Sequence, residues 1–427
     1  MKLWQKTILM LFALIALSAG TIFAYAATIW GTTKTTLKTT YTSVGKPGSE
    51  TIKATEPLSI LLMGVDTGDA SRGGDDSWQG NSDSMIVVTL NPKTDTTTMV
   101  SMERDTMTNI LDANGETTSS QQKMNAAYPF GYNADGINGA AAWSMNTIGQ
   151  QVGIKPNNFV AINMQGLISL VNAVGGITVY NDPNNWVATA DNAYPEGTIY
   201  ISDTTDGYDG ITIGPGEQLL DGEQALVYAR DRHHRANGDY GRIAAQREVI
   251  TQLMKKLLNM NNLSQYQKFL NNASTDIKTN IQVSDSNLQS LIAYRSCFKK
   301  IVSVQYQAIG YTNPADGGSY QLTPDQTLLA VQNLMLKSID QPTITALDSN
   351  VITYDNYIGY APSSYFLPSV TITEGGKQTV KGVDPDGSIV NITADNAANY
   401  VSTSGGAVEA ATSSSSAGSS SSAASNE

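Results

Sequence analysis

Continuous apolar runs set the strongest limit on how this 427-residue chain folds. Residues 58–65 and 85–90 are almost entirely apolar, which is typical of strands that are buried on both faces. A third strand is expected at 97–102, and the turn residues at 91–95 predict a hairpin between the second and third strands. The sequence therefore predicts a sheet that other elements cover on both sides.

Segments with helical spacing alternate with further strand-like runs. We expect helices at 136–152, 164–173, 221–228, 240–258, 285–298 and 324–336, and strands at 159–163, 177–180 and within 301–309. Residues 221–224 have the form of a capping box, which assigns Asp221 a structural role. The interleaving predicts an α/β fold, specifically an α/β/α sandwich in which helices flank a mixed central β-sheet.

The N-terminal segment predicts export from the cytoplasm. Lys2 and Lys6 precede an apolar stretch at 7–30, which would span about 36 Å as a helix and cross a bilayer with its N-terminus in the cytoplasm. A cleaved signal peptide is the alternative, because Ala24-Tyr25-Ala26 suits a signal peptidase. Both interpretations place the main domain outside the cell, and we favour the uncleaved single-pass anchor.

Composition divides the chain further. We expect an N-terminus with its transmembrane anchor (1–31), a linker (32–56), a main domain (57–345), a small β-rich appendage (346–400) and a disordered Ser- and Ala-rich tail (401–427). The net charge of −12 argues against binding to nucleic acid through the phosphate backbone. The single cysteine, Cys297, is expected in the core and not as a nucleophile.

Two acidic residues stand at the ends of neighbouring predicted strands. Asp66 follows the first strand, and Asp83 opens the second. Two such carboxylates can share one hard cation through oxygen ligands. Aspartate also caps turns, and spacing alone favours that simpler interpretation.

Basic residues concentrate in one later segment. Arg230, Arg232, Arg235, Arg242 and Arg247 alternate along an extended stretch and continue into the start of a helix. Guanidinium groups match phosphate oxygens, and a helix N-terminus adds donors, so the segment can surround a pyrophosphate. A solvated basic face has about equal weight on this pattern alone. The adjacent His233 and His234 are expected to be polar loop residues.

The ordered motifs of this chain resemble those of the LytR-CpsA-Psr family, most closely across residues 58–258. They are Leu61-Leu-Met-Gly-Val-Asp66, Ser82-Asp-Ser84, Ser101-Met-Glu-Arg-Asp-Thr106, Lys123-Met-Asn-Ala-Ala-Tyr128, Leu170-Val-Asn-Ala-Val-Gly-Gly176, Leu220-Asp-Gly-Glu-Gln-Ala-Leu-Val-Tyr-Ala-Arg-Asp-Arg232 and Gly238-Asp-Tyr-Gly-Arg242.

The resemblance implies a function at the cell wall. Members of the family are single-span membrane proteins whose external domain transfers teichoic acid, capsular polysaccharide or a related polymer from a polyprenyl pyrophosphate lipid to peptidoglycan, assisted by Mg²⁺ (or Mn²⁺). Asp66 and Asp83 would hold the metal, and Asp105 would act as base. The pyrophosphate would be bound by Arg104, Lys123, Arg230, Arg232 and Arg242, and apolar helices would enclose the prenyl chain.

The chain departs from the family pattern at three positions. It has Asn81 where the family has Arg, Glu103 where it has Pro, and Ala245 where it has the Arg of an Arg-Gln pair. Arg72 and Arg247 are the candidates to replace the missing phosphate contacts. The departures leave open a binding protein without turnover, and a pyrophosphatase would use the same site. A transcriptional regulator is disfavoured by the export signal and acidic charge.

Overall fold

The computed structural model describes residues 53, 55–67, 78–187, 196–200, 210–259, 276–281 and 294–402. The expected anchor at 1–31, nearly all of the linker, the tail after residue 402 and Arg72 lie outside the described residues. Among the helices that are described, none has the length and apolar character needed to cross a membrane.

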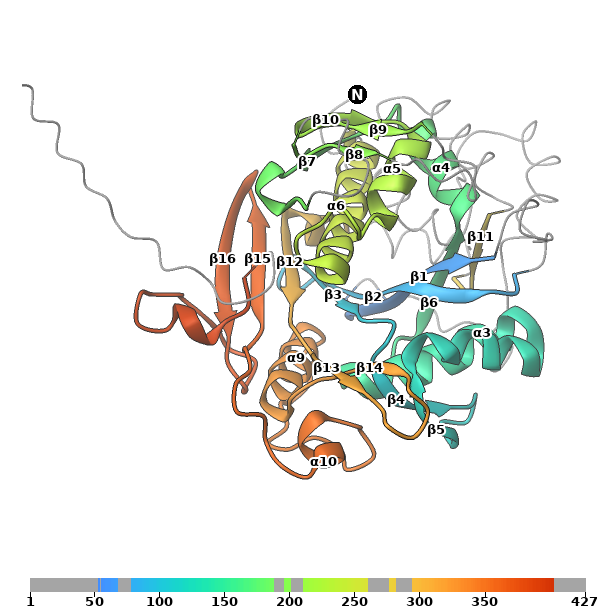
Figure 1. The fold of residues 1–427 in the computed structure, drawn as a ribbon, viewed down its shortest axis with the longest axis vertical. Coiled ribbons are helices and arrows are strands. Elements are labelled where there is room, and N and C mark those ends of the chain that lie inside the picture. The colour runs from blue at the N-terminus through green and yellow to red at the C-terminus, as the bar shows by residue number, and fades with distance from the viewer. Residues whose placement is uncertain are drawn as a thin grey trace, which may run out of the picture.

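A mixed sheet forms the centre of the described part of the chain (Figure 1), with the order β11-β6-β1-β2-β3-β12-β15-β16-β17. β1 is parallel to β6 and β3 is parallel to β12, while the other neighbours are antiparallel. The bounds are β1 Leu58–Asp66, β2 Asn81–Asn91, β3 Thr96–Met102, β6 Asn158–Asn163, β11 Ile277–Thr279, β12 Lys300–Gln305, β15 Ser369–Glu374, β16 Lys377–Val383 and β17 Ile389–Val390.

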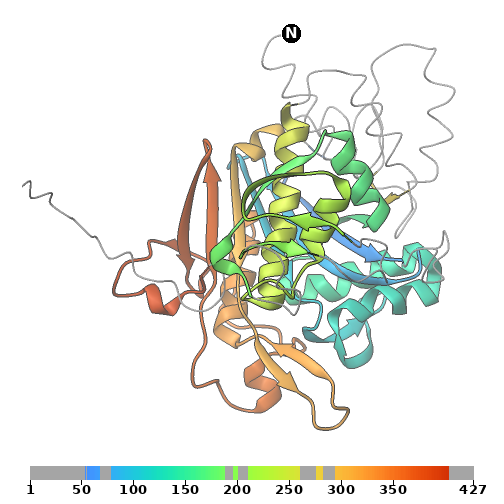
Figure 2. The ribbon, with the colours of Figure 1, turned by 45° about the horizontal axis from the view of Figure 1, so that its top comes forward.

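Helices cover both faces of this sheet. On one face lie α4 (Met164–Ala173), α5 (Gly222–Arg230) and α6 (Gly238–Asn259), which stand in front of the sheet in Figure 2. On the other face lie α3 (Ala127–Val152) and α9 (Asp325–Ser338). The strand β1 shows why its sequence is continuously apolar: Leu58 and Ile60 enter the first cluster, and Leu61 and Met63 enter the second. The predicted α/β fold with a mixed central sheet is confirmed.

Most of the predicted elements are present, with shifted ends. The hairpin of β2 and β3 forms, and α4 has the predicted bounds. The helix expected at 136–152 begins earlier, at Ala127, and is kinked where Asp135 and Gly136 leave the helical range. The capping box of Asp221 and Gln224 forms at the start of α5. Of the helix expected at 285–298, the described part is a 3-10 helix, η5 (Tyr294–Lys299).

Smaller pairs of strands lie around the central sheet. The strand predicted at 177–180 forms β7 (Ile177–Asn181) but pairs with β10 (Gly216–Leu220), outside the central sheet. The other pairs are β4 (Met107–Leu111) with β5 (Thr117–Lys123), β8 (Ile199–Tyr200) with β9 (Thr212–Ile213), and β13 (Ile309–Thr312) with β14 (Ser319–Leu322), which lies near α10 (Tyr354–Ile358).

The region after residue 346 is joined to the main sheet. β15 pairs along its whole length with β12, and β16 and β17 extend the same edge. What the composition suggested as a small β-rich appendage therefore supplies three strands of the central sheet. Cys297 is fully buried in the cluster beneath α4 to α6, as a core residue should be.

Candidate functional site

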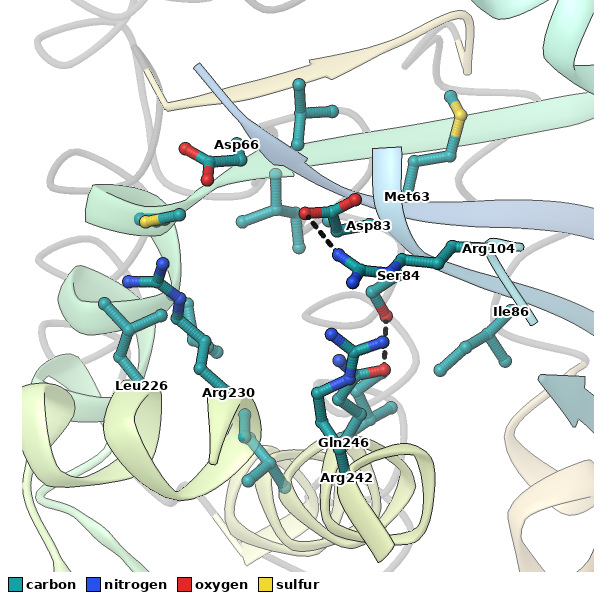
Figure 3. Close-up of a pocket in the computed structure, with 18 of the residues that line it drawn as sticks. Met63, Asp66, Asp83, Ser84, Ile86, Arg104, Leu226, Arg230, Arg242 and Gln246 are labelled. Atoms are coloured by element: carbon teal, nitrogen blue, oxygen red, sulfur yellow. Dashed lines mark hydrogen bonds and ion pairs between the residues drawn. The ribbon is translucent and has the colours of Figure 1, made fainter. Parts of the chain in front are cut away.

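A cavity of about 540 Å³ lies between β1, β2 and β6 of the sheet and the helices α4, α5 and α6. Its volume falls in the range of roughly 300–1,000 Å³ that is usual for ligand sites. The cavity has two kinds of wall. Apolar side chains line much of it, namely those of Leu62, Ile86, Ile162, Leu167, Leu226, Val249 and Ile250, and charged side chains gather in the remainder (Figure 3).

Asp66 and Asp83 both line this cavity, and both point into the space that Figure 3 shows. The pairing of β1 with β2 slips here, because Gly64 faces Ser84 while Val65 faces Ser82. The extra residue, Asp83, is a β-bulge, a feature that re-aims a side chain. Asn125 donates to its Oδ1 from 3.3 Å.

The two carboxylates fit a hard divalent cation that takes its remaining oxygens from phosphate and water. Among the described residues, no group of three or more His, Cys, Asp or Glu side chains could hold a metal ion. The assignment of Asp66 and Asp83 as metal ligands stays a prediction.

Arg104 follows β3 and reaches the cavity opposite the bulge. Its Nη1 lies 3.3 Å from Oδ2 of Asp83, and its Nε lies 3.5 Å from Oδ2 of Asp105. Burial acts to lower the pKa of Arg104, but the carboxylates of Asp83, Asp105 and Asp239 outweigh burial and raise it. Arg104 is therefore a permanent positive charge at the cavity wall.

Arg230 and Arg232 reach the same cavity from the end of α5 and the segment after it. The backbone of Asp231 between them is extended, and its side chain is buried and accepts from His234 Nδ1 at 2.8 Å. Because a carboxylate only accepts, Nδ1 of His234 carries the proton in this contact. The chain thus places alternate residues on opposite sides, with both arginines toward the cavity.

Arg235 does not join them in the cavity. It is buried, its guanidinium carbon lies 4.5 Å from the centroid of the Tyr228 ring, and its Nη2 donates to the Tyr228 carbonyl at 2.9 Å. Arg235 and Arg242 are buried while Arg232 is exposed, so only part of the segment is a solvated basic face. Arg235 holds the loop that carries Arg230 and Arg232.

Arg242 lies in the first turns of α6 and points at the cavity. Its Nη2 is 2.7 Å from Oδ2 of Asp239, while its buried Nε has no hydrogen-bond partner. Burial lowers the pKa of Arg242; Asp239 opposes this, and the charges of Arg104 and Arg232 add to it. A buried arginine that has an unfilled donor and lies near two other arginines can accept an anion as its missing partner.

Gln246 lines the cavity one turn after Arg242 and accepts a hydrogen bond of 3.0 Å from the Ser84 hydroxyl. We did not predict a role for Gln246, Asn125 or Asp239. The sequence could have indicated Gln246, because it follows Arg242 by four residues on a helix and so lies on the same helix face.

Other predicted residues lie outside the cavity wall. Lys123 is beside Asp105, with its Nζ 2.7 Å from Oδ1, and the two flank Arg104. Arg247 is buried on another side of α6, where its Nη1 donates to the Val304 carbonyl at 3.2 Å. Arg247 therefore does not replace a missing phosphate contact in this structure.

The three departures from the family pattern have different surroundings. Asn81 is exposed and faces Asp66 across the β1–β2 ladder. Ala245 is buried in the apolar cluster between the sheet and α6. Glu103 is buried next to Arg104 and does not line the cavity.

The fold and the site define an α/β protein with an arginine-rich, partly apolar cavity at the edge where strands of its central sheet end. Residues 25–337 match the model of the LytR_cpsA_psr family, so the chain belongs to that family.

Named relatives agree with this assignment. The chain is 37% identical over 369 residues to the biofilm regulatory protein A of Streptococcus mutans, covering 86% of this chain and 85% of that protein. It is 37% identical over 330 residues to the polyisoprenyl-teichoic acid–peptidoglycan teichoic acid transferase TagU of Enterococcus faecalis. That match covers 77% of this chain and 95% of that protein. The crystal structure of protein gbs0355 from Streptococcus agalactiae matches with a TM-score of 0.61 and 41% sequence identity. That match covers 74% of this chain and 98% of the crystallised one.

Proposed function

We propose that this protein is a phosphotransferase that moves an anionic or phosphate-linked glycan from a polyprenyl pyrophosphate carrier to peptidoglycan. The glycan is of the teichoic acid, capsular or other exopolysaccharide class. The observation that carries the proposal is a single cavity with arginines and aspartates in one part and apolar walls in the other. The printed name of the Enterococcus faecalis relative supports the same class of reaction.

The lipid carrier matches this division of the cavity. An isoprenoid chain needs apolar cover, which Leu62, Leu167 and Ile250 supply between the sheet and the helices. Its pyrophosphate needs charge and hydrogen-bond donors, which the guanidinium groups supply. The N-terminal sequence, with Lys2, Lys6 and the apolar stretch at 7–30, supports a place at the cell membrane with the main domain outside.

Asp66 and Asp83 are the residues that would hold Mg²⁺ or Mn²⁺. Mg²⁺ is bound in phosphate sites by one or two carboxylates together with the substrate's own oxygens, and this site offers two. When bound, the cation supplies positive charge beside the pyrophosphate and so favours departure of an anionic leaving group.

The transfer requires one bond to form and one to break. The oxygen of an acceptor hydroxyl attacks the phosphorus that carries the glycan, and the bond from this phosphorus to the bridging oxygen breaks, so polyprenyl monophosphate leaves. Arg104, Arg230, Arg232 and Arg242 stabilise the charge that grows on the phosphate oxygens. Asp105 lies beside Arg104, just outside the cavity wall, and takes the proton of an acceptor hydroxyl that approaches from that side; Lys123, 2.7 Å away, orients its carboxylate.

The direct test uses the full-length protein in detergent with a polyprenyl pyrophosphate glycan and peptidoglycan fragments, with and without Mg²⁺. Glycan transfer and lipid release are both measured. We expect metal-dependent transfer that is lost in Asp83→Ala and Arg104→Ala. The matched control is Lys93→Ala, an exposed lysine paired with Asp340 at the opposite end of β2.

Two other outcomes would replace the proposal. Lipid release without transfer would indicate a pyrophosphatase, in which water takes the place of the acceptor hydroxyl. Tight lipid binding with neither product would indicate a non-catalytic binding protein. The assays need the chain through residue 390, because β15, β16 and β17 belong to the central sheet.

A further inference from the structure

Two β-hairpins meet beside the Asp105–Lys123 pair, outside the wall of the cavity. Asp105 and Thr106 lead from β3 into the hairpin of β4 and β5, and Lys123 ends β5 opposite Met107. The hairpin of β13 and β14 lies alongside, because the Gln321 amide donates to the Asp105 carbonyl at 2.9 Å and Thr106 forms a β-bridge with Gln321. Figure 1 shows both hairpins and α10 on the same side of the molecule. A substrate that reaches Asp105 from outside the cavity therefore passes beside them.

Tyrosine rings lead outward from Lys123 along the β13–β14 hairpin. The Nζ of Lys123 lies 5.8 Å from the centroid of the Tyr320 ring, and Tyr320 pairs with Tyr311 across the hairpin. The Tyr311 ring makes an edge-to-face contact with Tyr357 of α10, and the two ring centroids are 5.4 Å apart. Tyr320 is buried, whereas Tyr311 and Tyr357 are partly exposed. The rings thus connect the Asp105–Lys123 pair with the surface of the protein.

The outer end of this series of rings is an exposed but supported tyrosine. Tyr360 follows α10 and is 66% exposed, and its ring packs edge-to-face against Tyr354 with the centroids 6.4 Å apart. A ring that is held in place by another ring offers a binding surface that loses little entropy when a ligand binds. We call the five residues the tyrosine surface: Tyr311, Tyr320, Tyr354, Tyr357 and Tyr360.

The charge of the tyrosine surface is opposite to that of the cavity. The charged residues of β13, β14, the turn between them and α10 are Asp316 and Asp355, and both are acidic. The neighbouring β5 carries Thr, Ser and Gln side chains before it reaches Lys123. An anionic glycan, which the arginines of the cavity attract, is therefore not favoured here. The surface fits an uncharged ligand that has both apolar and hydrogen-bonding groups.

We propose that the tyrosine surface, together with β5, binds the sugar chain of the peptidoglycan acceptor and so delivers the acceptor hydroxyl to Asp105. The identity of this ligand rests on the proposed function above. A sugar ring of such a chain has a face of C–H groups and a rim of hydroxyl and amide groups. The C–H face packs on the negative face of an aromatic ring, and the rim forms hydrogen bonds with phenol, hydroxyl and amide side chains. The donor lipid and the acceptor then occupy separate surfaces that meet at Arg104 and Asp105.

The test compares an exposed tyrosine of this surface with an exposed tyrosine elsewhere. The variants are Tyr360→Ala, Tyr360→Trp and the control Tyr180→Ala, whose residue on β7 is 58% exposed and lies away from α10 in Figure 1. The full-length proteins in detergent are assayed for transfer, which gives kcat and the KM for peptidoglycan. Calorimetry gives the Kd of peptide-free glycan strands, released from peptidoglycan by an amidase, and of farnesyl pyrophosphate, a short analogue of the lipid carrier. Thermal unfolding verifies that each variant is folded.

We expect Tyr360→Ala to raise the KM for peptidoglycan and the Kd of the glycan strands by about two- to tenfold, because one aromatic contact is lost. Its kcat and its Kd for farnesyl pyrophosphate should change by less than about twofold, since the cavity and Asp105 are untouched. Tyr360→Trp retains a ring and should behave like the wild-type protein, as should Tyr180→Ala.

Each contrary result has its own meaning. Transfer with the same KM and the same strand affinity in the wild-type protein and Tyr360→Ala would overturn the inference while leaving the proposed function intact. Where the strands bind too weakly for calorimetry, the KM for peptidoglycan decides alone. Strands that bind through Tyr360 without any transfer would support the surface and overturn the proposed function. Absence of both transfer and strand binding in the wild-type protein would overturn both.

Discussion

The two faces of the central sheet are built from the same strands but end in different packing. On the face toward α3 and α9, Leu61, Val87 and Phe159 are completely buried in a closed apolar cluster. On the face toward α4, α5 and α6, Leu62 and Ile162 from the same strands border the cavity. Strand composition therefore does not distinguish the closed face from the open one.

The helices make the difference. α5 has only nine residues and ends at Arg230. The chain then runs through a hydrogen-bonded loop, in which Asp231, His234 and Arg235 are buried, before α6 begins at Gly238. The space beyond the end of α5 receives arginine side chains, which cannot fill an apolar gap as a longer helix would. In this fold the position of helix ends, together with one bulge at Asp83, converts a packed face into a binding face.

The largest effect is expected on the closed face. Phe159→Ala removes a fully buried ring from β6 and should lower the free energy of unfolding by about 3–5 kcal/mol. Ile162→Ala, on the same strand but beside the cavity, should lower it by less than about 2 kcal/mol, because space already exists there. Denaturant unfolding of both variants measures the contrast, and equal losses would show that the two faces do not differ.

The next effect is expected on catalysis and not on stability. Arg104→Ala should lower the rate of glycan transfer by about 10²–10³-fold, because a charge that stabilises the phosphate oxygens is lost. Arg104, Asp83 and Asp105 are each 23–35% exposed at the cavity wall, where solvent still weakens their ion pairs, so the free energy of unfolding should change by less than about 1 kcal/mol. If Arg104→Ala loses several kcal/mol of unfolding free energy together with its transfer rate, Arg104 is required for folding and not specifically for catalysis.

The apolar part of the cavity can be separated from the charged part. Ile250→Trp places a large side chain into the space between α6 and the sheet and should raise the Kd of farnesyl pyrophosphate about tenfold. Inorganic pyrophosphate, which has no prenyl chain, should bind to this variant and to the wild-type protein equally. Calorimetry with both ligands compares them, and parallel losses for the two would contradict an apolar site for the chain.

The smallest effect is expected from the start of α5. Asp221→Ala removes a capping box in which the Asp221 carboxylate accepts from the Gln224 amide at 2.9 Å. The free energy of unfolding should fall by about 1 kcal/mol. Because Arg230 ends the same nine-residue helix, we also expect a modest loss of farnesyl pyrophosphate affinity. Unchanged stability would show that α5 is held by its packing alone.

Local patterns were sufficient for much of the fold and part of the site. Apolar runs and helical spacing predicted the strands β1, β2, β3 and β6 and the helices α4, α5, α6 and α9, because burial imposes a period on each element. Apolar runs and helical spacing are properties of residues close in sequence. Strand ends raised Asp66 and Asp83 as a possible cation pair, although their spacing alone favoured turn caps, and the density of arginines left a phosphate site and a solvated face equally weighted; the structure places Asp66, Asp83, Arg230, Arg232 and Arg242 at one cavity.

Only the tertiary structure decided the rest. It places Gln246 in the cavity and Arg247 behind it, it sets Asp105 and Lys123 beside Arg104 and outside the cavity wall, and it buries Glu103 against Tyr240. It also joins residues 369–390 to a sheet whose first strand begins at Leu58. These outcomes depend on contacts between separate elements, from Lys123 and Asp105, 18 residues apart, to Gln246 and Ser84, 162 residues apart. The periodicity within one element does not show which side chains of another element it will contact.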